Sequence, residues 1–115
     1  MSNMRKAANA YASSSAHRST REQEADIFRR ANAALREGGS AGPLGRARAL
    51  ADNGQLWLSV MDLIRDPENA LPAPLRAAIV SVGHTVQREM QQSAPNFEFL
   101  ISVNENIAAG LSGQT

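Results

Sequence analysis

The chain has no cysteine, and aromatic residues make up only 4% of its 115 residues. Without thiols it cannot form disulfides, thiolate metal sites or a cysteine nucleophile. β-Branched residues are scarce, with five valines and five isoleucines against 20 alanines, 10 leucines and four methionines. This balance favours helices over sheets. The length fits one domain.

Long hydrophobic segments are also missing. No run of about 18 apolar residues occurs, so we expect no membrane insertion. The N-terminus lacks the leucine-rich stretch of a secretory signal. We therefore expect a cytoplasmic protein.

The net charge is only +1, but the two halves of the chain differ. Residues 1–50 carry nine basic and four acidic side chains, and residues 51–115 carry three basic and seven acidic ones. Such a split could mean that the basic half binds nucleic acid, but the halves of a bundle more often carry complementary solvated faces. Because no basic run is longer than two residues, nucleic acid is the less favoured partner. We expect a solvated basic face that includes Arg18, Arg21, Arg29 and Arg30.

Apolar residues recur with the period of an α-helix along the chain. This pattern predicts an all-α antiparallel bundle of about four helices, with a short helical segment at residues 4–12 before it. Ser13, Ser14 and Ser15 predict a linker after that segment. Ser19 and Thr20 each precede Glu or Gln by three residues, which is the capping-box pattern of a helix start. The expected single domain divides into an N-terminal segment and linker, a bundle and a tail, at residues 1–18, 19–111 and 112–115.

Apolar residues at steps of three and four define the expected core. Its predicted members are Ile27, Phe28, Leu50, Trp57, Met61, Ile79, Val82 and Val86. The second main helix also carries Leu56, Leu58, Val60 and Leu63 outside its main stripe, so we expect it to contact neighbours on two sides. Asn104 interrupts the apolar seam of the last helix, where it either sets register and partner choice or caps a neighbouring helix end.

Groups that carry catalysis or bind metal are not recognisable. His17 and His84 have no second histidine or carboxylate at metal-ligand spacing, so both are expected to be solvated. The glycines near residue 40 are not followed by the Lys-Ser or Lys-Thr of a phosphate loop. We therefore expect a non-enzymatic protein without catalytic residues, metal or cofactor.

Several short stretches, taken in order, resemble a known family. They are Ala10-Tyr11, Arg21-Glu22 with Glu24-Ala25, Ala49-Leu50 through Asn53 to Leu56-Trp57, Asn69-Ala70-Leu71-Pro72 with Leu75-Arg76 and Ile79, Val82-Gly83 with Val86, and Ile101 through Asn104 to Ile107-Ala108-Ala109-Gly110-Leu111. Together they resemble the FlaF family of flagellar biosynthesis proteins from alphaproteobacteria. Family members often carry proline where Ala70 stands and an apolar residue where His84 stands.

The resemblance implies a protein that binds flagellin as a secretion chaperone and supports its export and synthesis, often alongside an FlbT-like regulator. A partner of this kind must cover the amphipathic terminal helices of flagellin before export, which a small bundle with a groove can do. The alternative is a post-transcriptional regulator that acts on flagellin mRNA, through RNA or a protein partner.

We expect flagellin to contact the last helix and the proline-rich connection before the third. The candidate residues are Leu71, Pro72, Phe97, Leu100, Ile101, Asn104, Ile107, Ala108 and Leu111. Apolar residues lie on more than one side of this helix, so one side could pack inside while another binds. In the alternative interpretation, Ile101, Asn104 and Ile107 are ordinary core and cap residues.

Overall fold

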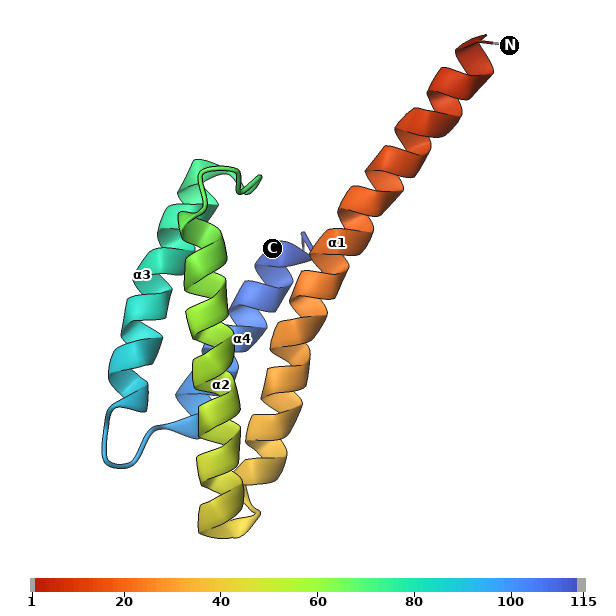
Figure 1. Cartoon of the computed structure of the whole chain (residues 1–115). Helices are drawn as coiled ribbons and strands as arrows, with labels where there is room; N and C mark the ends of the chain where they lie inside the picture. The colour runs from red at the N-terminus through yellow and green to blue at the C-terminus, as the bar shows by residue number, and fades with distance from the viewer. Residues whose placement is uncertain (1, 114–115) are drawn as a thin grey trace.

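Four helices account for most of the chain in a computed structural model that describes the backbone of residues 2–113 and the side chains of residues 20–113. They are α1 (Ser2–Gly39), α2 (Gly42–Arg65), α3 (Ala73–Met90) and α4 (Phe97–Leu111), and residues 2–113 contain no strand. Consecutive helices run antiparallel, with α1 packed against α2 and α4, and α3 mainly against α2 (Figure 1). The prediction of an all-α bundle of four helices is confirmed.

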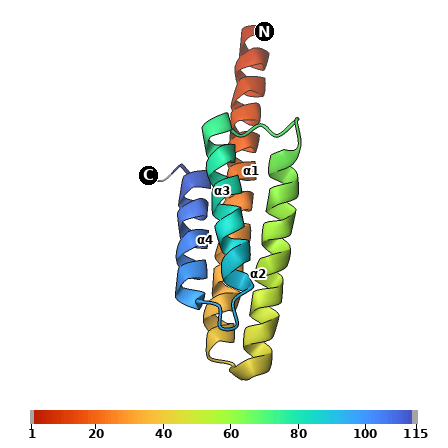
Figure 2. The ribbon, with the colours of Figure 1, turned by 90° about the vertical axis from the view of Figure 1, so that its left-hand side faces the viewer.

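The first helix is longer than the sequence predicted. Its N-terminal part extends past the ends of the other helices, and the molecule measures 63 × 27 × 23 Å (Figures 1 and 2). The expected linker at Ser13–Ser15 and the helix start at Ser19 or Thr20 are wrong, because α1 is continuous from Ser2. Three serines in a helix cost at most about 2 kcal/mol in total, whereas nucleating a second helix costs about 4 kcal/mol.

The turn between α1 and α2 depends on glycine. Gly42 has φ +83, a backbone conformation that L side chains rarely adopt, and Pro43 follows in the first turn of α2. A Cβ at Gly38 would lie 2.6 Å from the Cβ of Ala49 and 2.8 Å from the carbonyl oxygen of Gly45. The two helices therefore approach closely here and diverge toward the other end of the bundle (Figure 1).

Most of the predicted core is buried. Phe28, Trp57, Met61, Ile79 and Val86 are at most 4% exposed, and Leu50 and Val82 are partly buried against the core.

Ile27 is the exception, because its side chain is 46% exposed. The buried face of α1 runs through Ala25, Phe28, Asn32 and Leu35, at steps of three and four. Ile27 precedes Phe28 by one residue and so lies about 100° around the helix from it, at the edge of the buried face. Its assignment to the core is wrong.

Candidate functional site

An apolar groove of about 440 Å³ is lined mainly by residues of α1 and α2, with further residues from the α2–α3 connection, α3 and α4. It lies near the end of the bundle toward which α1 and α2 diverge, a divergence that the ribbon shows (Figure 1). Ten of the described residues that line it are apolar: Ile27, Phe28, Leu56, Val60, Leu63, Ile64, Leu71, Ile79, Ile107 and Leu111. The remaining five are Glu24, Asp52, Gln55, Ser59 and Asn69. A volume of this size is typical of ligand pockets.

Each long wall of the groove exposes one large aliphatic side chain. Ile27 of α1 is 46% exposed and Leu63 of α2 is 61% exposed. Exposed aliphatic groups are common singly, but two on opposite walls of one apolar groove form a continuous surface that a partner can cover.

An aromatic pair connects the groove to the core of the bundle. Phe28 lines it and meets Trp57 edge to face, with ring centroids 5.6 Å apart and an interplanar angle of 70°. Trp57 is fully buried and donates a hydrogen bond from Nε1 to Oδ1 of Asn104 at 3.0 Å. The groove therefore lies directly beside the buried side chain of Trp57 and its packing partners.

The connection between α2 and α3 contributes Asn69 and Leu71 to the groove and is ordered by side chains. Oδ1 of Asp66 accepts from the backbone N–H of Glu68 at 2.9 Å. Asn69 donates to the carbonyl oxygen of Leu63 at 3.0 Å and accepts from the N–H of Leu71 at 2.9 Å. Together with its prolines, these bonds restrict the connection before any partner arrives, which lowers the entropy cost of binding.

A chain of buried amides lies deeper in the bundle. Asn104 of α4 donates from Nδ2 to Oδ1 of Asn53 on α2 at 2.8 Å, and Asn53 donates to the sulfur of Met90 on α3 at 3.5 Å. Asn104 and Asn53 are both at most 1% exposed. Asn104 therefore sets the register of α4 against α2, one of the two roles that the sequence left open, and caps no neighbouring helix.

Histidine and carboxylate side chains are the candidate metal ligands in the described part of the chain. No group of three or more histidine, aspartate or glutamate residues is placed to hold a metal there. His84 is exposed as predicted, and the side chain of His17 lies outside the described residues. Hydrogen bonds to Asp26 and, to a smaller extent, Glu22 raise the pKa of the exposed Arg29 guanidinium. No helix within residues 2–113 is both long and apolar enough to cross a membrane.

A family model for the flagellar protein FlaF matches residues 7–111, a range that contains every residue of the groove. The chain belongs to the FlaF family. FlaF is a family of flagellar proteins and not of enzymes. Comparison with curated proteins and with solved structures found no significant match.

The predicted flagellin-contacting residues separate into three groups in this FlaF-family bundle. Leu71, Ile107 and Leu111 line the groove, where Ile107 is partly buried and Leu71 and Leu111 are only 6% and 7% exposed. Leu100, Asn104 and Ala108 are buried in the bundle, so their side chains are not accessible to a partner in this structure. The others are Pro72, which is exposed, and Phe97 and Ile101, which are partly buried. Phe97 lies under the guanidinium of Arg46, 4.2 Å from the ring centroid.

Sequence reasoning did not assign Ile27, Leu56, Val60 and Leu63 of this FlaF-family chain to a binding site. The signal was the apolar surface of α2, which is wider than one stripe. We expected those extra residues to contact a second neighbouring helix, but Leu58 and Leu63 are 55% and 61% exposed. For these two leucines that expectation is wrong. Leu58 directly follows Trp57 and Leu63 directly precedes Ile64, so each lies about 100° around α2 from the buried stripe of the helix.

Proposed function

We propose that the chain is a cytosolic chaperone that binds an amphipathic terminal helix of flagellin in the groove between α1 and α2 and thereby supports flagellin export and synthesis. The observation that carries this proposal is the pair of exposed aliphatic side chains, Ile27 and Leu63, on opposite walls of an apolar groove. Amphipathic helices bind such grooves through apolar residues spaced three and four apart.

The mRNA alternative receives less support from the distribution of charge. Three arginines of α1 already pair with acidic groups: Arg21 with Glu24, Arg29 with Asp26 and Glu22, and Arg36 with Glu105 of α4. RNA recognition also commonly uses aromatic stacking platforms. Of the four described aromatic residues, Trp57 and Phe28 are buried and Phe97 and Phe99 are partly buried, so none of them offers a fully exposed ring.

The proposal is tested by co-expression with the cognate flagellin followed by size-exclusion chromatography. Leu63→Gln removes an aliphatic contact in the groove without adding charge. Leu58→Gln makes the same change at an exposed leucine on the same helix that does not line the groove. We expect wild type and Leu58→Gln to co-elute with flagellin, and Leu63→Gln to bind at least about tenfold more weakly, as for loss of a well-packed apolar contact.

Two results would contradict the proposal. One is wild-type protein that does not associate with flagellin, and the other is full binding by Leu63→Gln. A shift that needs the flagellin transcript, and that falls steeply with salt, would instead favour the mRNA alternative.

A further inference from the structure

The charged residues of the groove all have one sign. Glu24 projects from the α1 wall and Asp52 from the α2 wall, and no basic residue is among the described residues that line the groove. The remaining lining side chains are apolar or neutral. Among the described lining residues, the charges that a partner meets are therefore these two carboxylates.

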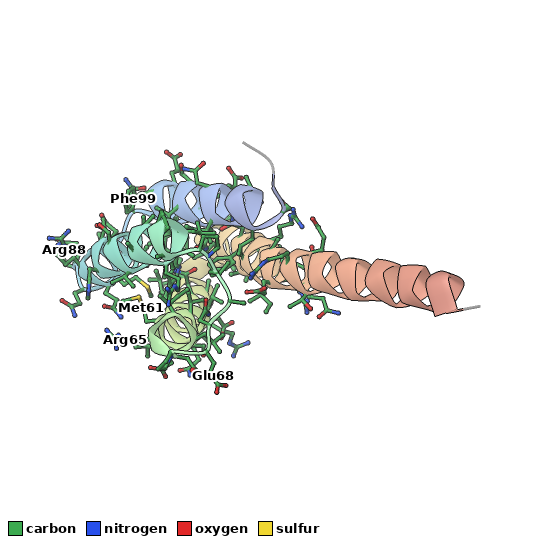
Figure 3. All side chains as sticks on the ribbon, turned by 90° about the horizontal axis from the view of Figure 1, so that it is seen from above. Met61, Arg65, Glu68, Arg88 and Phe99 are labelled. Carbon is green, nitrogen blue, oxygen red and sulfur yellow. The ribbon has the colours of Figure 1, made fainter. Side chains whose placement is uncertain are left out.

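Asp52 is the freer of the two carboxylates. It is exposed and forms no ion pair among the described residues, whereas an oxygen of Glu24 lies 3.1 Å from a guanidinium nitrogen of Arg21. Arg65 lies on the side of α2 that faces away from α1, so its charge does not offset the acidic rim (Figure 3).

The ends of three helices also contribute to the negative electrostatic potential at the groove. Helices α2 and α4 both end at this end of the bundle, and Ile64 and Leu111 from their last turns line the groove. The last carbonyl groups of a helix carry about half a negative charge, and the first N–H groups carry about half a positive one. Only α3 begins here, so the helix ends sum to a negative contribution.

The size of the groove restricts what can fill it. A volume of about 440 Å³ accommodates a few side chains but not a whole helix, which is about 10–12 Å wide with its side chains. A bound helix would therefore lie across the opening and place its apolar side chains inside the groove. The residues that flank its apolar stripe would then lie close to Asp52 and Glu24.

From the negative charge at the rim and the size of the groove, we infer that the groove selects an amphipathic helix with lysine or arginine beside its apolar stripe. Asp52 is the main carboxylate that pairs with this basic side chain, and Glu24 is the secondary one. This inference rests on the proposed function only in taking a flagellin segment as the natural occupant. The selectivity itself is a property of the groove.

Two synthetic helical peptides without tryptophan test the inference. They share leucines at positions i, i+3, i+4 and i+7 and differ only in flanking lysines or glutamates. Trp57 is the only tryptophan of the chain and contacts Phe28 of the groove, so its fluorescence reports binding to the full-length protein. We expect the lysine peptide to bind about three- to tenfold more tightly at low salt, with the difference lost near 1 M salt.

Conservative variants test which carboxylate causes the preference for the lysine peptide. Asp52→Asn should remove most of the lysine preference and Glu24→Gln a smaller part. Asp62→Asn, an exposed carboxylate of the same helix that does not line the groove, should leave it unchanged.

The inference is overturned if the peptides bind equally, if neither binds, or if the preference survives in the double variant Asp52→Asn and Glu24→Gln. A concentration-dependent dimer that Leu63→Gln abolishes would assign the groove to a second copy of the chain and also overturn it. Flagellin binding without a lysine preference would leave the proposed function standing, whereas a lysine preference without flagellin binding would support only the present inference.

Discussion

Asn104 connects α4 to α2 through both ends of its amide, since Oδ1 accepts from Trp57 and Nδ2 donates to Asn53. All three side chains are at most 1% exposed. Buried polar groups stabilise a fold only when their partners are present, and removing one partner leaves the others unsatisfied. The amide therefore belongs to the interior of the bundle.

Replacing Asn104 should destabilise the free protein. Asn104→Ala leaves the Nε1–H of Trp57 and Oδ1 of Asn53 without partners, which should lower the free energy of unfolding by about 2–4 kcal/mol in urea denaturation. Asn104→Asp keeps the acceptor for Trp57 but loses the donor to Asn53 and buries a carboxylate, so it should also be destabilising. Asn106→Ala, an exposed change on the same helix, should alter stability by less than about 0.5 kcal/mol. Wild-type stability in Asn104→Ala would show that the amide chain contributes nothing.

The sequence indicated that Asn104 was unusual but could not identify its partners. An asparagine on an apolar seam predicts a role either in register and partner choice or in capping a neighbouring helix end. Which residues it contacts depends on how far α2 is shifted along α4, and that shift is decided by the packing of all four helices. The same limit explains Ile27, whose position at the edge of the α1 face places it in the groove and not in the core.

At the scale of helices, prolines lie in the connections 66–72 and 91–96 that separate α2, α3 and α4, in agreement with the predicted bundle of about four helices. Asn96 caps the start of α4, where its Oδ1 accepts from the N–H of Phe99 at 3.1 Å. Reasoning from local composition failed at Ser13–Ser15, where a composition typical of linkers lies inside a continuous helix. Local composition does not measure the cost of starting a helix twice.

The groove could be predicted only in part. Leu71, Ile107 and Leu111 were expected to contact a partner and do line it, and the wide apolar surface of α2 was visible in the sequence. The open side of α2 could not be identified, because it depends on the direction in which α1 diverges from α2. At the opposite end of the two helices, the close contact at Gly38 holds α1 and α2 together.

The close approach of α1 and α2 is tested by a pair of glycine substitutions. Gly38→Ala places a Cβ 2.6 Å from that of Ala49, so the helices must separate, and we expect a loss of about 1–2 kcal/mol after the gain in helix propensity. A Cβ at Gly110 of α4 meets nothing within 4 Å, so Gly110→Ala should be neutral or stabilising by up to about 1 kcal/mol. Urea denaturation of both variants checks the pair, and equal effects would contradict the packing argument.

For the molecule as a whole, the opposite charges of the two halves are partly matched within the fold. Arg36 of α1 forms an ion pair with Glu105 of α4. In addition, Arg29 donates a hydrogen bond to the neutral hydroxyl of Ser112, beyond the end of α4, at 3.3 Å. Arg29 and Arg30 are exposed, in agreement with the predicted solvated face, whereas Arg21 is half-buried against Glu24 and the side chain of Arg18 lies outside the described residues. The basic half therefore contributes to cohesion between helices as well as to the surface.

A partner in the groove should stabilise the whole bundle, because it binds walls from α1 and α2 that only the folded state brings together. A flagellin terminal peptide at a concentration of about 100 times its Kd should raise the free energy of unfolding by about 2.7 kcal/mol. For a chain of this length, this corresponds to a rise in Tm of about 10 °C. Thermal melts followed by the fluorescence of Trp57 measure the shift, since the peptide can be chosen without tryptophan. Leu63→Gln should melt near wild type when free, because Leu63 is exposed, and should lose most of the shift. Leu58→Gln should retain it. A shift of equal size in Leu63→Gln would mean that the peptide stabilises the chain from another surface.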